Sequence, residues 1–171
     1  MKPKINQLKF IALSIVLSLA GTLSAQVGGK GGSPTTDSRL LEAVKASGLK
    51  HTIMKNGDIR MIFDTGDGRS QAVVIATRVS QYLNLEVREI WGVAWKGSAE
   101  LTAEQANKLL KDNERRKIGA WGLAKDGNTY YATFTVKIAA NADGESLKAG
   151  IMAVAEVSDA LEKELTNKDE F

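Results

Sequence analysis

The chain of 171 residues has no cysteine, a single histidine and only two prolines. Without cysteine it forms no disulfide and carries no lipid attached to a cysteine. With His51 as its one imidazole, it cannot assemble a zinc site of the usual kind. No G-x-S-x-G motif is present, and none of the carboxylates belongs to a recognisable catalytic pair. We therefore expect no metal, no cofactor and no enzymatic activity.

Residues 1–25 have the pattern of a signal peptide. Three lysines precede an apolar run at residues 10–20, which is too short to cross a bilayer as a helix, since that requires about 20 residues. Residues 23–25, Leu-Ser-Ala, are typical of a cleavage site. We expect cleavage between Ala25 and Gln26, and a periplasmic or secreted protein without a membrane partner after cleavage. An uncleaved N-terminal anchor is the alternative.

Removal of this segment changes the charge balance. The whole chain carries 23 basic and 20 acidic residues, a net charge of +3. Residues 1–25 hold three lysines and no acidic residue, so the remaining 20 basic residues (23 minus three) balance the 20 acidic ones. The basic run at residues 115–117 adjoins Glu114 and has no interleaved aromatic residues. We therefore expect no nucleic-acid partner.

Composition divides the remaining chain into three parts. Residues 26–36 are rich in glycine and read as a flexible linker; residues 28–33 superficially resemble a phosphate-binding loop, but the spacing is wrong and no strand precedes them. Residues 37–166 form a single domain, and we expect residues 167–171 to be frayed. The domain begins with a helix capped by Asp37 or Ser38 and ended by Gly48.

The stretch at residues 101–127 carries the clearest local signals. Thr102 and Gln105 have the spacing of a capping box, which predicts a helix that ends near Asn113. A strand at residues 118–125 follows, and Asp126-Gly127 is typical of a hairpin turn into a strand at residues 129–139. A long helix capped by Ser146 and running to about Thr166 completes the domain.

The strands between the first two helices are also marked by turns and periodicity. Asn56-Gly57 joins extended segments at residues 51–55 and 58–64, and residues 71–78 are apolar on both faces, which places them centrally in the sheet. A strand at residues 85–95 puts Trp91 and Trp95 on one face, with a bulge indicated at Gly92. We predict an α+β fold with helices packed on an antiparallel sheet, in the order α-β-β-β(-β)-α-β-β-α.

Residues 117–127, preceded by Asn-Glu-Arg-Arg at residues 113–116, are similar to the signature region of the YbjN domain family. The resemblance spans residues 37–165 and implies a fold like that of the class I type III secretion chaperones. It implies an exported bacterial sensory-transduction regulator that binds a protein or peptide, or a second copy of itself as a homodimer. The family supplies no catalytic residues.

The residues to which we assign binding are three tryptophans and the polar residues of that signature. Exposed aromatic side chains mark contact surfaces, and Trp121 lies on the less apolar strand, so we expect it to be the most exposed tryptophan. Packing of Trp91 and Trp95 between sheet and helix is the alternative. The complete set of predicted binding residues is Trp91, Trp95, Trp121, Asn113, Arg115 and Arg116.

Two further classes of function stay open in the sequence. Asp64-Thr65-Gly66 resembles the catalytic loop of aspartic proteases, in which two such loops meet. A single copy would need a homodimer, and Asp67-Gly68 directly after it is typical of an ordinary hairpin turn. The third class is a periplasmic module that binds a small molecule between sheet and helices.

Overall fold

The structure is a computed structural model and describes residues 35–171. The predicted signal peptide and most of the predicted linker lie outside the described residues. Within residues 35–171 the chain forms three helices and seven strands. In order they are α1 (Ser38–Ser47), β1 (Thr52–Ile53), β2 (Ile59–Gly66), β3 (Arg69–Ile75), β4 (Ser80–Tyr82), β5 (Leu85–Gly97), α2 (Ala103–Arg115), β6 (Ala120–Asp126), β7 (Thr129–Ala139) and α3 (Gly144–Thr166).

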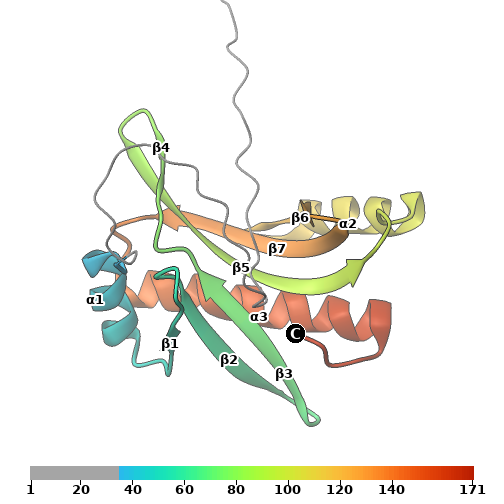
Figure 1. Cartoon of the computed structure of the whole chain (residues 1–171), viewed down its shortest axis with the longest axis horizontal. Coiled ribbons are helices and arrows are strands. Elements are labelled where there is room, and N and C mark those ends of the chain that lie inside the picture. Colours follow the sequence, from blue (N-terminus) through green and yellow to red (C-terminus); the bar gives the residue numbers. More distant parts are fainter. Residues whose placement is uncertain (1–34) are drawn as a thin grey trace, which may run out of the picture.

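The strands form one open antiparallel sheet in the order β1-β2-β3-β5-β7-β6, with the short β4 paired to β5 (Figure 1). Every pairing is antiparallel. The predicted α+β class with an antiparallel sheet is therefore confirmed. The predicted central position of the third strand is also correct, because β3 lies between β2 and β5.

The helix ends follow from local capping. Asp37 caps α1 and Gly48 ends it with a φ of 70°, as predicted. Both hydrogen bonds of the predicted capping box between Thr102 and Gln105 are present, although α2 continues past Asn113 to Arg115. The prediction that Ser146 caps α3 is wrong: the cap is Asp143, which accepts a hydrogen bond from the backbone N–H of Ser146, so the helix begins three residues earlier, at Gly144.

The core lies between the sheet and α3, which crosses the strands (Figure 1). Fully buried side chains from the helix, such as Leu147 and Ile151, meet fully buried side chains from the strands, such as Ile75, Ile90 and Phe134. Each such aliphatic side chain contributes roughly 1.5–3 kcal/mol on burial. Helix α1 packs against the start of α3, while α2 lies beside β6.

A bulge in β5 changes the faces on which the tryptophans lie. The register shifts between Val93 and Trp95, so that Val93 pairs with Thr133 and Trp95 with Ala132. Because the extra residue reverses the alternation, Trp95 turns to the side of the core while Trp91 lies on the opposite face. The prediction that Trp91 and Trp95 share a face is wrong, and the bulge follows Gly92 instead of falling on it.

Strands β3 and β5 separate along most of their length. They pair only at Val74 with Trp91 and at Ile75 with Ile90, whereas β3 pairs with β2 along nearly its whole length. Figure 1 shows the β2–β3 hairpin diverging from β5, with residue 171 near the point where they part. We call this gap the β3–β5 split. Residues 167–171 reach into it and are hydrogen-bonded there, so they are not frayed as the sequence led us to expect.

Candidate functional site

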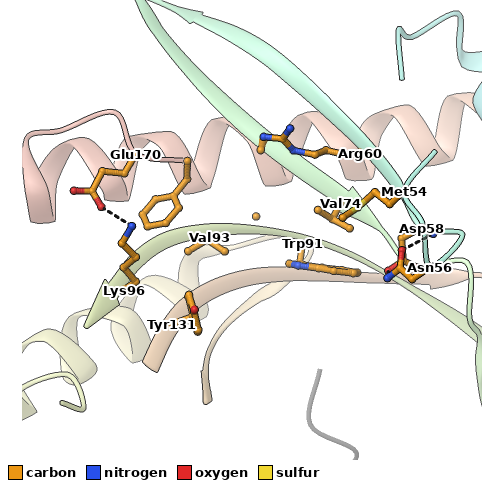
Figure 2. Close-up of a pocket in the computed structure, with 13 residues that line it drawn as sticks. Met54, Asn56, Asp58, Arg60, Val74, Trp91, Val93, Lys96, Tyr131 and Glu170 are labelled. Atoms are coloured by element: carbon orange, nitrogen blue, oxygen red, sulfur yellow. Dashed lines mark hydrogen bonds and ion pairs between the residues drawn. The ribbon is translucent and has the colours of Figure 1, made fainter. Parts of the chain in front are cut away.

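A pocket of about 170 Å³ lies beside the β3–β5 split, on the sheet face that carries Trp91 (Figure 2). We call it the Trp91 pocket. Its residues come from the turn between β1 and β2, from β2, β3, β5 and β7, and from the segment that follows α3. They are Met54, Asn56, Asp58, Arg60, Ala72, Val74, Trp91, Gly92, Val93, Lys96, Tyr131, Glu170 and Phe171.

Trp91 and Val93 of β5, with Val74 of β3, supply the apolar part of this pocket (Figure 2). Trp91 as a whole residue is only 3% exposed. Its Nε1 is buried and has no hydrogen-bond partner within the described residues. A buried donor left without an acceptor costs about 1–3 kcal/mol. A ligand that offers an acceptor to this indole would therefore recover a hydrogen bond that the protein itself does not make.

The two ends of the Trp91 pocket are polar. At one end, Lys96 Nζ lies 3.2 Å from a carboxylate oxygen of Glu170 and 5.2 Å from the centre of the Phe171 ring. This ammonium group, together with a second lysine, holds the pKa of Glu170 below its usual range. At the other end, Asn56 Nδ2 donates to Asp58 at 2.7 Å, within the turn that joins β1 to β2.

A buried glutamine fills the β3–β5 split from within the sheet. Gln71 is fully buried, and its Nε2 donates to the carbonyl oxygens of Ala72 and Val93, each at 3.1 Å. Its amide thus bridges two strands whose backbones no longer reach one another. The Oε1 atom of Gln71 is buried without a partner in the described part of the chain. The split is therefore lined by polar atoms as well as apolar ones.

Residues 167–171 run along the edge of β3 in this split. The backbone N–H of Ala72 donates to the carbonyl oxygen of Phe171 at 2.6 Å, and Ser70 N–H donates to Asp169 Oδ1 at 3.1 Å. On the side of the split that faces α3, the fully buried carboxylate of Glu162 accepts a hydrogen bond from the backbone N–H of Glu170 at 2.5 Å. Burial raises the pKa of Glu162. The split thus presents backbone donors on one side and a buried acceptor on the other.

The residues predicted from the signature region come together elsewhere, at the junction of α2 and β6. Trp121 is 7% exposed, so the prediction that it is the most exposed tryptophan is wrong. Its Nε1 donates to Asp112 at 2.8 Å, and its backbone N–H donates to Asn113 Oδ1 at 2.6 Å. Arg116 donates to the same Asp112 at 2.8 Å. Burial opposes ionisation of Asp112, but the hydrogen bonds from Arg116 and Trp121 outweigh it and hold its pKa below the usual range.

These contacts indicate a structural role for the junction. The Trp121 ring also packs edge-on against Phe134, with centroids 5.1 Å apart. Its polar atoms already have partners, whereas Arg115 is largely exposed. The structure therefore brings Asn113, Arg115, Arg116 and Trp121 to one place but separates them from the Trp91 pocket. The sequence contained one indication of this structural role, because Asp112 and Arg116 are four positions apart, the spacing at which opposite charges pair along a helix.

The remaining sequence candidates occupy ordinary structural positions. Asp64 is exposed at the end of β2, where it accepts a hydrogen bond from the N–H of Gly66 at 2.9 Å, which is typical of a turn. His51 is exposed beside the carbonyl oxygen of Leu49. Residues 35–171 contain no group of three or more His, Cys, Asp or Glu side chains placed to hold a metal ion. Among the described helices, none has the length and apolar character needed to span a membrane.

Comparisons with known proteins give one weak similarity. No family model matches the chain. The chain is 28% identical over 101 residues to expansin-A26 of Oryza sativa subsp. japonica, an alignment that covers 58% of this chain and 35% of the expansin. The chain thus spans about a third of the length of that relative. The similarity is compatible with secretion in general.

These findings correct the family assignment. The resemblance to the YbjN domain family is wrong, since no family model matches and the similarity found is to an expansin. The corresponding function, an exported bacterial regulator of the YbjN type, is withdrawn with it, as are its alternatives. The residues that suggested the family are explained by local geometry: Gly119 has a φ of 78°, and Asp126-Gly127 forms the turn between β6 and β7.

Proposed function

We propose that this protein is a secreted, non-enzymatic binding module that takes an extended peptide segment along the β3–β5 split and into the Trp91 pocket. The observation that carries the proposal is the early separation of β3 from β5, which leaves the edge of β3 at Ser70 and Ala72 without a neighbouring strand from the sheet. Residues 169–171 take up this edge within the chain itself, as extended segments do when they bind a strand edge through backbone groups while adjacent pockets select side chains.

The dimensions of the site favour a peptide over a broad protein surface. A pocket of about 170 Å³ has room for a large side chain but not for an extended, flat interface. Apolar side chains of β3 and β5 flank the place where a strand added to β3 would direct a residue. The indole N–H of Trp91 then provides one fixed polar contact.

The proposal also specifies the compartment of the protein and a likeness of its fold. The proposed compartment is a periplasm, where the partner would be another exported chain. The proposed likeness, in the arrangement of helices and strands, is to the type III secretion chaperones. A homodimer, in which one copy offers an extended segment to the other, is a special case of the proposed binding.

Peptide binding can be tested by displaying random ten-residue peptides to the full-length protein and measuring affinities of the selected peptides by calorimetry. Substitution Val93→Lys places a charged chain in the Trp91 pocket and should weaken binding at least tenfold. Ile62→Lys, an exposed position of β2 that does not line the pocket, is the matched control and should leave binding unchanged.

A second measurement tests the role of the strand edge. Methylation of alternate backbone nitrogens in a bound peptide removes the groups that a β-strand uses for pairing, so one alternation should abolish binding and the other should not. Peptides that bind equally well to the Val93→Lys variant would overturn the proposal. Selective binding of oligosaccharides in the Trp91 pocket in place of peptides would overturn it as well.

A further inference from the structure

Residues 168–171 occupy the β3–β5 split in the manner of a ligand, and their contacts fall into two kinds. Backbone contacts do not depend on side-chain identity: Ala72 N–H donates to Phe171 O, Arg69 Nη1 donates to Lys168 O at 2.6 Å, and Glu162 accepts from Glu170 N–H. These contacts fix an extended chain that runs parallel to β3, since residue 168 lies by residue 69 and residue 171 by residue 72.

The second kind of contact selects side chains. Lys96 contacts both the carboxylate of Glu170 (Figure 2) and the ring of Phe171, so a single lysine selects an acidic residue and the aromatic residue that follows it. The backbone N–H of Ser70 donates a hydrogen bond to the carboxylate of a second acidic residue, Asp169. The split therefore matches a segment with the order acidic, acidic, aromatic.

The resident segment does not use the whole site. Strands β3 and β5 pair again at Val74 and Trp91, so a chain that continued beyond the position of Phe171 would leave the split there and emerge over Trp91. The indole N–H at that place has no partner within residues 35–171. A peptide that makes the contacts of residues 168–171 and also offers an acceptor to this indole would gain one hydrogen bond over the resident segment.

We propose that residues 168–171 are an intramolecular ligand, and that the partner is a peptide with an acidic residue directly before an aromatic one, which binds by displacing them. This inference rests on the proposed peptide-binding function and names its ligand class. The ion pair of Glu170 with Lys96 suits exchange, because both side chains are partly exposed and ion pairs in contact with solvent are weak. The partner peptide extends past its aromatic residue with an acceptor group that reaches the indole.

The test uses a fluorescent peptide with the sequence Asn-Lys-Asp-Glu-Phe-Gln and measures its polarisation with the full-length protein. The substitution Phe171→Ala loosens the resident segment and should raise the affinity for this peptide by up to about tenfold, the factor by which a resident segment that fills the site about nine-tenths of the time would weaken binding. Lys96→Glu should weaken binding, and a peptide with Lys in place of Glu should restore it. Ile62→Lys is the matched control, and circular dichroism verifies that each variant is folded.

The outcomes separate this inference from the proposed function. If random peptides bind at the Trp91 pocket but Phe171→Ala changes nothing, or if exchanging Glu and Phe in the peptide leaves affinity unchanged, the inference is overturned and the peptide-binding function stands. If no peptide binds to either the wild type or the Phe171→Ala variant, both are overturned. Competition by the unlabelled peptide at the same affinity, together with the charge-swap rescue, supports the inference.

Discussion

The buried side chain of Arg88 provides a sharp test of how the fold is held together. Its side chain is 1% exposed, and its guanidinium donates to Ala76 O at 2.6 Å, to Thr77 O at 2.9 Å and to Asp37 Oδ2 at 2.9 Å. Asp37 is the only one of these acceptors that carries a charge, and it also caps α1. We predict that Asp37→Asn strongly destabilises the protein, although asparagine is itself a good helix cap.

The magnitude follows from what the substitution leaves behind. Removing one partner of a buried ion pair costs about 3–5 kcal/mol, because the other charge stays buried without compensation. Asp37 is 17% exposed, so we expect a loss of about 3 kcal/mol, at the lower end of this range. Arg39 also contacts Asp37 but is 41% exposed, so Arg39→Ala should cost less than about 1 kcal/mol and serves as the control.

Urea denaturation followed by circular dichroism measures these differences. The double variant Asp37→Asn with Arg88→Met removes the stranded charge and should recover part of the lost stability. A loss below about 1 kcal/mol for Asp37→Asn, no larger than that of Arg39→Ala, would refute the reasoning. It would mean that the backbone carbonyls alone satisfy the buried guanidinium.

The same pair predicts a dependence on pH. Hydrogen bonds from Arg39 and then Arg88 hold the pKa of Asp37 well below its usual range. The unfolded chain therefore binds this proton more readily than the folded one, and the stabilisation is present above about pH 4 and is lost as pH falls below it. Between pH 7 and pH 3 the difference between wild type and Asp37→Asn should narrow by about 1 kcal/mol. A stability difference between wild type and Asp37→Asn that grows as the pH falls would contradict the lowered pKa of Asp37.

Three further predictions concern single positions. Leu83 is 81% exposed at a φ of 53°, so Leu83→Asn should raise stability by up to about 1 kcal/mol, seen as a higher melting temperature. A Cβ at Gly92 would lie 2.6 Å from the Ser158 hydroxyl, so Gly92→Ala should lower the free energy of unfolding, measured in urea, by about 1–3 kcal/mol. Gly122→Ala is the control, because a Cβ there meets nothing within 4 Å and should cause no such loss. Equal losses for the two variants would contradict the close approach of α3 to β5. Asp112→Asn weakens the charged acceptor that joins α2 to β6 and should cost about 1.5–3 kcal/mol, with a red shift of tryptophan emission; unchanged emission would contradict it.

Much of the fold was predictable because its signals are local. The turns at Asn56-Gly57 and Asp126-Gly127, the capping box at Thr102, and the alternation of β7 all involve residues a few positions apart. Such interactions depend on backbone preferences that the sequence states directly. They sufficed for the α+β class and the antiparallel sheet.

The errors have tertiary causes. One extra residue in β5 moved Trp95 to the core side, and periodicity alone does not reveal such a bulge. Trp121 is buried because Asp112 accepts from its indole across a helix–strand junction. Of the three tryptophans singled out from the sequence, only Trp91 lies at the candidate site.

The sequence by itself determined the α+β class and most of the turns, and its lack of cysteine excludes a disulfide. Tertiary structure alone decided the candidate site, because its parts are far apart in the chain: Ser70 meets Asp169 across 99 positions, and Gln71 meets Val93 across 22. Where two strands separate, and which segment enters the gap between them, depends on how all the packed elements fit together. No local pattern encodes that outcome.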